Sequence, residues 1–227
     1  MGGLGTKGDI MYNFEYVPAS EWKPVKAELI RIIQRLQNEV RNDFTFQYHF
    51  VGSSQRNMIT RDPKSNIGFD FDVNIEVNDP DENYSPAEIR NILRKGLDRV
   101  TNSDGVPLFR YDYTEDSTRV LTIKVKDKVS SRIKHSCDFC IINNCHDGKQ
   151  QYIRYNKRQN YYSWEYQPKG FYQLSEKIEF CKNNRLWSEV KNCYLDKKNT
   201  NSDSHKKSRS IFAESIHQVC QQNGYYK

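Results

Sequence analysis

The chain contains segments in which hydrophobic and polar residues alternate, a pattern typical of a strand with one buried face. In residues 69–77, Phe, Val and Ile occupy the odd positions, and four polar residues occupy the even ones: Asp70, Asp72, Asn74 and Glu76. Residues 44–51 carry aromatic side chains at every second position. Because successive strand side chains point to opposite faces, both segments are predicted to be strands. His49 falls opposite the aromatic face, where we interpret it as a structural histidine.

Apolar residues at spacings of three and four predict helices in other parts of the chain. Residues 22–41 form one amphipathic pattern, and a second begins at Ser85. Ser85, Pro86 and Glu88 have the residue types favoured at the N-cap, first and third positions of a helix. Three further helical patterns follow toward the end of the chain: 171–183, 185–198 and 208–222.

Two further strand pairs are predicted between these helices. Residues 118–126 pair with 133–142, and a hairpin covers residues 150–167 with its turn at 156–160. Asp138 lies inside the otherwise apolar run CDFCII. Burying one carboxylate without a partner costs several kcal/mol, so Asp138 is expected to meet a cation or a strong hydrogen-bond donor. A buried salt bridge is the alternative to a functional role.

Composition is typical of a globular protein in a reducing compartment. The 227 residues are 36% hydrophobic, and no apolar stretch approaches the length of a membrane-spanning helix. No secretory leader is recognised, and six cysteines in a chain of this size do not suggest a disulfide framework. We therefore expect a cytoplasmic protein without a membrane partner, in which residues 1–19 form a flexible leader.

Charge is unevenly distributed along the chain. Residues 1–148 contain 20 Lys and Arg against 22 Asp and Glu, whereas residues 149–227 contain 15 against 7. The net charges of the two parts are therefore −2 and +8. An acidic site facing a basic, tyrosine-rich part suits an enzyme that holds metal on one wall and polyphosphate or nucleic acid on the other. A solvated basic surface is the alternative.

The two aspartates of the 69–77 strand are suited to binding divalent metal ions. Asp70 and Asp72 leave the same face with Cα atoms roughly 6.5–7 Å apart. Two-metal phosphoryl-transfer sites hold their ions about 3.5–4 Å apart, and two carboxylates with this Cα spacing can bind both ions. Two close carboxylates over an apolar layer are costly without cations, and an all-oxygen ligand set favours Mg²⁺ over Zn²⁺.

A zinc site is the alternative metal centre. Its ligands would be Cys137, Cys140, Cys145 and His146. Strand alternation places Cys137 and Cys140 on opposite faces, whereas a tetrahedral site needs converging ligands. We therefore interpret these cysteines as small buried hydrophobic residues.

A Gly-Ser-Ser turn follows the 44–51 strand, at Gly52, Ser53 and Ser54. Glycine permits close backbone approach, and its neighbouring N–H groups with a serine hydroxyl can cradle phosphate oxygens. The segments VGSS, FDFDVNI and SCDFCII resemble the Gly-Ser, Asp-x-Asp and third-carboxylate motifs of the DNA polymerase β-like nucleotidyltransferase superfamily. With its helical C-terminal part, the chain is most similar to the oligoadenylate synthetase and cyclic GMP-AMP synthase branch, which includes the bacterial CD-NTases.

This resemblance implies an α+β fold. A catalytic core with a mixed β-sheet and helices packed on one side would cover residues 20–168, and a C-terminal helical lobe would cover 169–227. Asp70, Asp72 and Asp138 would bind two Mg²⁺ ions, with Mn²⁺ as a substitute, and Asp138 would act as the general base. The implied nucleotide-binding residues are Gly52, Ser53, Ser54, Lys191, Tyr194 and Ser204, with Tyr161 and Tyr162 as alternative stacking partners for the base.

One feature departs from the pattern of that branch. Seventeen residues separate Gly52 from Asp70, which is more than we expect there. The extra residues, within 59–68, are predicted to form a loop over the nucleotide, and they leave the choice of substrate open.

The implied activity is template-independent transfer of nucleotides from NTPs or dNTPs, giving short oligonucleotide or cyclic signals and pyrophosphate. Such signals would reach a downstream effector protein, in a role such as antiviral defence. Transfer to a protein, including the chain's own C-terminal tyrosines, or to an RNA end is the alternative. A third reading is a degenerate member that binds nucleic acid through its basic part.

Overall fold

The computed structural model describes residues 12–79, 81–103, 107–145, 147–168, 170–203 and 205–225. The chain divides into two compact units. The sheet unit comprises residues 16–61 and 66–168, and the helical unit comprises residues 1–15, 62–65 and 169–227. A mixed sheet with helices in one unit, and helices in the other, confirm the predicted α+β class. No helix of the described residues is long and apolar enough to cross a membrane.

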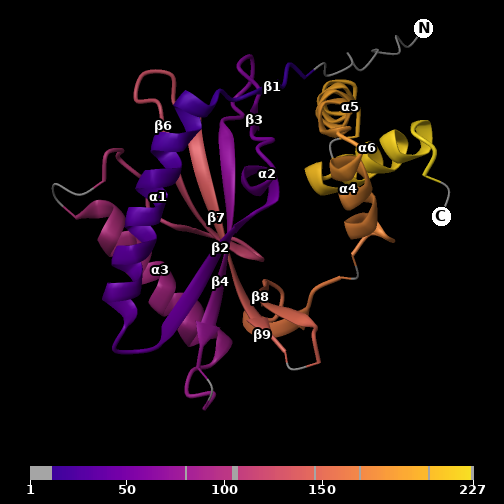
Figure 1. Cartoon of the computed structure of the whole chain (residues 1–227). Coiled ribbons are helices and arrows are strands. Elements are labelled where there is room, and N and C mark those ends of the chain that lie inside the picture. Colours follow the sequence, from indigo (N-terminus) through magenta and orange to yellow (C-terminus); the bar gives the residue numbers. More distant parts are fainter. Residues whose placement is uncertain are drawn as a thin grey trace, which may run out of the picture. The chain divides into compact units, whose positions relative to one another are not determined.

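The sheet unit is built on a seven-stranded mixed sheet (Figure 1). Its strands are β2 (Thr45–Val51), β4 (Phe69–Asn78), β5 (Glu115–Asp116), β6 (Val120–Lys126), β7 (Ile133–Asn144), β8 (Gln150–Asn156) and β9 (Tyr161–Tyr166). Their order is β2-β4-β7-β6-β5, and β8 pairs with both β7 and β9. The β4–β7 pair is parallel and the other pairs are antiparallel. Two short strands, β1 (Glu15–Tyr16) and β3 (Thr60–Arg61), lie outside this sheet.

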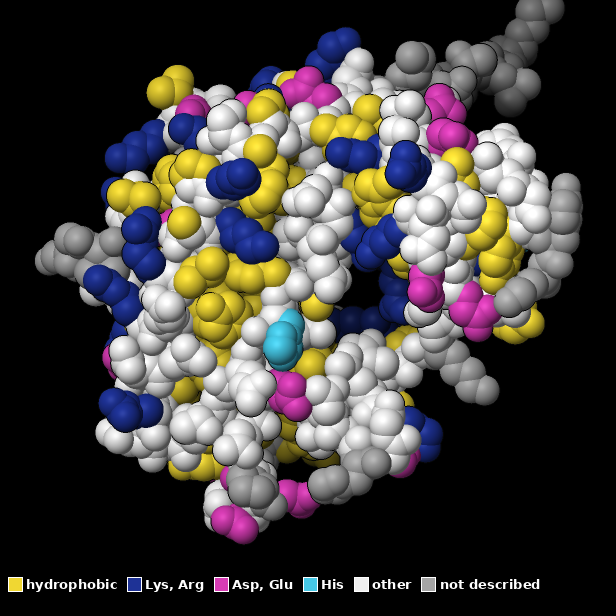
Figure 2. Space-filling model, viewed as in Figure 1, with side chains coloured by type: hydrophobic (Ala, Val, Ile, Leu, Met, Phe, Trp, Pro, Cys, Tyr) yellow, Lys and Arg dark blue, Asp and Glu magenta, His cyan; other side chains and the backbone are white. Residues whose placement is uncertain are grey.

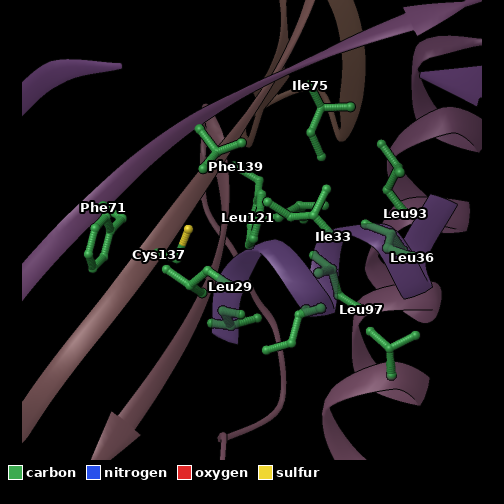
Figure 3. Packing of buried hydrophobic residues seen from close by; sticks show 14 of the residues in the cluster. Leu29, Ile33, Leu36, Phe71, Ile75, Leu93, Leu97, Leu121, Cys137 and Phe139 are labelled. Atoms are coloured by element: carbon green, nitrogen blue, oxygen red, sulfur yellow. The ribbon is translucent and has the colours of Figure 1, made fainter. Parts of the chain in front are cut away.

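Two helices, α1 (Ala19–Val40) and α3 (Pro86–Asn102), pack against one face of the sheet. Figure 3 shows their leucine and isoleucine side chains directed toward apolar side chains of β4, β6 and β7, among them Phe71, Leu121 and Phe139. The capping box predicted at Ser85 and Glu88 is present, with each residue's side chain accepting a hydrogen bond from the other's backbone N–H. Because both helices cover the same face, the opposite face of β4 and β7 is left for polar side chains.

His49 lies on this polar face, where it pairs in register with Asn74 and is exposed. The predicted face of His49 is therefore confirmed, because α1 and α3 pack against the other face of the sheet. Its interpretation as a structural histidine stays a prediction.

The helical unit contains α4 (Leu174–Asn183), α5 (Trp187–Asn199) and α6 (Ser208–Gln222), which confirms the three predicted helices. The first begins later than predicted, because Gln173 before it has a left-handed backbone with φ of 50°. Two distant segments also belong to this unit. The Asn199 side chain accepts from the backbone N–H of Phe14 at 2.6 Å and donates to its carbonyl at 3.1 Å.

Part of the 59–68 segment, residues 62–65, belongs to the helical unit. Asp62 is buried and accepts hydrogen bonds from the backbone N–H groups of Asn13 and Lys64. This segment is therefore held by the N-terminal residues of the same unit. Its covering of a nucleotide stays a prediction.

His135 of β7 is buried in the core of the sheet unit. The rings of Phe69, Phe109 and Tyr111 lie with centroids 5.6, 4.9 and 6.0 Å from its imidazole, and its Nε2 has no hydrogen-bond partner in the described part of the chain. Burial, with a smaller contribution from Lys134, lowers the pKa of His135 to about 4. The imidazole is therefore neutral in the folded protein at pH 7.

We expect His135 to make the protein less stable in acid. In the unfolded chain the His135 imidazole has its ordinary pKa of 6.5, whereas in the folded chain its pKa is about 4. Between pH 6.5 and pH 4 the unfolded chain binds a proton at this residue that the folded chain does not. The free energy of unfolding is therefore unaffected above pH 6.5 and falls by up to about 3 kcal/mol as the pH drops toward 4. His135→Leu should show a smaller loss of melting temperature between pH 7.5 and pH 4.5 than the wild type. An exposed control, His217→Gln, should behave as the wild type; equal acid sensitivity in all three proteins would contradict this assignment.

Candidate active site

The structure brings three aspartates together on the polar face of the sheet. In the parallel β4–β7 pair, Asp72 lies opposite Asp138 and Asp70 lies opposite Ser136. Residues opposite each other on neighbouring strands point to the same face, so the three carboxylates converge. One oxygen from each lies within 4.8 Å of the others, and this is the only such group of potential metal ligands found among the described residues.

Hydroxyl groups from the neighbouring strand orient two of these carboxylates. Ser136 of β7 donates a hydrogen bond to Oδ1 of Asp70 at 2.9 Å, and Thr122 of β6 donates to Oδ1 of Asp138. Thr122 lies opposite Asp138 in the β6–β7 register. Each hydroxyl fixes one oxygen of its partner and leaves the other oxygen available to a ligand.

Burial raises the pKa values of all three carboxyl groups, and repulsion from neighbouring aspartates raises those of Asp70 and Asp72 further. The pKa of Asp70 rises well above its usual range because the group is buried and lies beside Asp138 and Asp72. Burial and Asp138 raise the pKa of Asp72 to about 6, against the opposing effect of Arg56. The pKa of Asp138 is raised by burial and lowered in part by the Thr122 hydrogen bond and Lys124. Clustered acids of this kind are destabilised unless a cation joins them.

The residues fit a hard divalent cation. The donor set consists of carboxylate oxygens, which Mg²⁺ and Mn²⁺ prefer. No cysteine or histidine of the described residues takes part in a metal-binding group. Cys137 is buried, while Cys140 and Cys145 are half-buried free thiols, and His146 lies outside the described residues. The part of the chain that the structure describes therefore gives the alternative zinc site no support.

The Gly-Ser-Ser segment forms a single helical turn, α2 (Gly52–Gln55), after β2. Gly52 has a positive φ of 66°, and a Cβ atom there would overlap Oδ2 of Asp72. Glycine is thus required because the Asp72 carboxylate packs directly against this backbone. Ser53 is half-buried, whereas Ser54 is buried and its hydroxyl donates to the carbonyl of Val51 at 3.1 Å.

The remaining predicted nucleotide-binding residues lie elsewhere in the chain. Lys191 and Tyr194 belong to α5 of the helical unit, where Tyr194 is buried and its ring meets the ring of Phe212 edge-on. Ser204 lies outside the described residues. Of the alternative stacking partners, Tyr161 is exposed, and the Tyr162 hydroxyl donates to Asp116. Their contacts with a nucleotide stay predictions.

Three residues of the site did not emerge as candidates from the sequence. Ser136 shares the alternation of Asp138, so its position on the same strand face was a usable signal. Thr122 could be assigned only from the register of β6 against β7, and Arg56 only from the path of the chain after α2. The site therefore includes orienting hydroxyls and a nearby cation as well as its acidic ligands.

If the chain has the activity that the sequence resemblance implies, Thr122→Val should slow nucleotide transfer by about 10- to 100-fold, the usual effect of removing a partner that orients a metal ligand. Because the Thr122 hydrogen bond lowers the pKa of Asp138, its loss should also move the acidic limb of the pH–rate profile to higher pH. Thr122→Ser keeps the donor and should keep the wild-type profile. A Thr122→Val enzyme with an unchanged rate and profile would show that this hydroxyl does not orient Asp138.

Three acids that converge from two strands, next to a Gly-Ser turn, are the arrangement implied by the nucleotidyltransferase resemblance. Comparison with solved structures supports this fold. The chain is similar to the Vibrio cholerae cyclic AMP-GMP synthase DncV, described as a prokaryotic cGAS homolog, with 11% identity, a TM-score of 0.60, and coverage of 89% of this chain and 68% of that one. It is also similar to the Bradyrhizobium diazoefficiens CD-NTase CdnG in complex with GTP, with 11% identity, a TM-score of 0.52, and coverage of 86% and 65%.

A second DncV structure, in complex with the linear intermediate 5′ pppA(3′,5′)pG, matches with 11% identity and a TM-score of 0.53 over 89% of this chain and 74% of that one. The chain thus spans 65 to 74% of the chains in these three structures, which are of two proteins. No family model and no curated protein matches the sequence. The chain therefore shares its fold with these cyclic AMP-GMP synthase and CD-NTase structures, and at this identity the likeness shows the fold alone.

Proposed function

We propose that the chain is a nucleotidyltransferase that transfers a nucleoside monophosphate from an NTP or dNTP to a hydroxyl group. The observation that carries this proposal is the convergence of Asp70, Asp72 and Asp138 within 4.8 Å on the polar face of the sheet. Their raised pKa values favour a site that is completed by divalent cations. The fold shared with cyclic dinucleotide synthases supports the same chemistry.

Each residue of the site has a distinct task in this proposal. Asp70 and Asp72 would hold two Mg²⁺ ions, or Mn²⁺ in their place. When bound, such ions neutralise the triphosphate and the leaving pyrophosphate and make the attacking hydroxyl more acidic. Asp138 accepts the proton of that hydroxyl, a role favoured by its raised pKa. The backbone around Gly52 and Ser53 holds phosphate oxygens beside Asp72.

The reaction forms one bond and breaks one. The acceptor oxygen bonds to the α-phosphorus of the NTP, and the bond from that phosphorus to the bridging oxygen of the pyrophosphate breaks. The acceptor that we favour is the hydroxyl of a second nucleotide, which gives a short oligonucleotide or a cyclic product. We assign this product a signalling role in antiviral defence, read by an effector protein in the cytoplasm. The six free cysteines are consistent with a reducing compartment.

The test is incubation of the full chain with each NTP and dNTP, singly and mixed, with Mg²⁺ or Mn²⁺. Pyrophosphate release is measured alongside mass spectrometry of the small products and of the intact protein. We expect pyrophosphate and a new oligonucleotide or cyclic nucleotide, and neither from Asp70→Asn. A mass increase of the protein itself would favour transfer to a protein hydroxyl instead. No pyrophosphate with any substrate would count against the proposal.

A further inference from the structure

The hairpin formed by β8 and β9 contains a depression whose lining includes none of the three carboxylates. Its volume is about 410 Å³. Its lining residues are Thr118, Arg154, Tyr155, Asn156, Lys157, Arg158 and Glu165. The backbone N–H of Tyr155 donates to the carbonyl of Thr118 at 2.9 Å, which ties the hairpin to the beginning of β6.

Positive charge dominates this depression. Arg154, Lys157 and Arg158 are exposed, and no carboxylate of the described residues forms an ion pair with any of them. The single acid of the lining, Glu165, accepts a hydrogen bond from the Ser163 hydroxyl at 3.2 Å. Three cations gathered at one turn repel each other, so a polyanion that joins them would lower the free energy of the surface.

Aromatic side chains lie on both faces of this hairpin. Tyr155 and Tyr162 stack with ring centroids 4.5 Å apart, and Tyr161 is 59% exposed. In the β8–β9 register Arg154 lies opposite Ser163 and Asn156 lies opposite Tyr161. Arg154 and Tyr161 therefore point to the same face of the hairpin. A cation and an exposed aromatic ring on one face are the two contacts that a phosphate and an unpaired base require.

A buried arginine holds this surface in place. Arg90 of α3 is 1% exposed and donates to Oδ1 of Asp116 and to the carbonyls of Ser117 and Val120. The Tyr162 hydroxyl donates to the other oxygen of Asp116 at 3.0 Å. This network fixes one side of the hairpin to α3. The hairpin is therefore already ordered before a ligand binds, and binding would cost little free energy for ordering it.

We propose that the β8–β9 hairpin binds single-stranded nucleic acid. Arg154, Lys157 and Arg158 contact successive phosphates, and a base stacks on Tyr161. A single strand is favoured over a duplex because the bases of a duplex are stacked on each other and not available to the tyrosine. The inference does not rest on the nucleotidyltransferase activity, since none of these residues belongs to the carboxylate site. The hairpin pairs with β7 at Ile142–Asn144, so it is joined to the strand that carries Asp138.

The test measures fluorescence anisotropy of labelled 12-nucleotide single strands, one of RNA and one of DNA, with the full chain in EDTA and without NTP. We expect Arg154→Glu/Arg158→Glu to weaken binding at least 10-fold, and Arg154→Lys/Arg158→Lys to stay within about 3-fold. A plot of log affinity against log salt concentration should also be less steep for the charge-reversed protein. We expect its slope to be smaller in magnitude by about 1.4, which is about 0.7 for each of the two lost phosphate contacts. Tyr161→Ala should weaken binding at least 5-fold, whereas Tyr161→Phe should not.

The matched control reverses two exposed cations elsewhere, Arg35 of α1 and Lys95 of α3, with the same change of net charge. Figure 2 shows that Lys and Arg side chains on the α1 side of the molecule are spaced among hydrophobic and other side chains. We expect Arg35→Glu/Lys95→Glu to bind within 2-fold of the wild type. Equal loss in both double variants, no binding of either strand, or equal affinity for a duplex would overturn the proposal. Asp70→Asn should bind as the wild type, which separates this test from that of the activity.

Discussion

Asp72→Asn is expected to abolish nucleotide transfer and to raise the melting temperature of the metal-free protein. Burial and Asp138 raise the pKa of Asp72 to about 6 in the folded state. A carboxyl group with a raised pKa contributes stability below the unfolded pKa of 3.8 and loses it as the pH rises through 6. At pH 7.5 the ionised group therefore costs about 1–3 kcal/mol, which the neutral amide removes. The gain corresponds to a melting temperature higher by about 5 °C.

The measurement is thermal unfolding in EDTA at pH 7.5 and pH 4.5, with and without Mg²⁺, beside the rate of pyrophosphate release. We expect the stabilisation at pH 7.5 to shrink at pH 4.5, where the wild-type carboxyl group takes up its proton. Mg²⁺ should stabilise the wild type and not the variant, and the rate should fall at least 1,000-fold. Asp203→Asn, an exposed acid of the helical unit, is the control and should change neither quantity. A less stable Asp72→Asn protein in EDTA would show that the carboxylates do not repel each other.

Local sequence patterns were sufficient to predict the elements and the faces of the central strands. The alternation in 69–77 placed Asp70 and Asp72 on one face, and the capping residues located the beginning of α3, as the structure has them. These features depend on residues within one or two turns or pleats of each other. The same reasoning singled out Asp138 as a lone carboxylate in an apolar strand, but only the family resemblance implied that it lies with the other two acids.

Contacts between distant segments could not be predicted in the same way. The register that sets Asp72 opposite Asp138 joins residues separated by α3 and β6, and no local pattern specifies it. The same holds for Thr122 and for Asp62, which bonds to a residue 49 positions away. The pattern identified Gly52 as a phosphate-binding glycine, whereas the structure shows that its missing side chain makes room for the Asp72 carboxylate. A glycine that is required by the side chain packed against it can be recognised only when the position of that side chain is known.

Gly52→Ala is the second change with a large expected effect. The backbone at Gly52 has a φ of 66°, and a methyl group there would overlap Oδ2 of Asp72. The carboxylate must therefore move, and a displacement of about 1 Å in a catalytic site can cost about 100-fold in rate. We expect transfer to fall at least 100-fold and the free energy of unfolding to fall by about 2–4 kcal/mol, from the backbone conformation and the overlap together.

Gly148→Ala separates these two contributions. Gly148 also has a positive φ, of 76°, but, apart from its two chain neighbours, no atom of the described residues lies within 4 Å of the position of its Cβ. Its alanine variant should lose only the backbone contribution, about 1 kcal/mol, and keep its activity. In the double variant Gly52→Ala/Asp72→Ala the overlap is gone, so its stability should exceed the sum expected from the single changes, while transfer stays abolished. Chemical denaturation of the wild type, the single variants Gly52→Ala, Asp72→Ala and Gly148→Ala, and the double variant measures these contributions to the free energy of unfolding. If Gly52→Ala lowers the free energy of unfolding no more than Gly148→Ala does, Asp72 does not pack against this turn. That result would contradict the inference that Gly52 is required to make room for the Asp72 carboxylate.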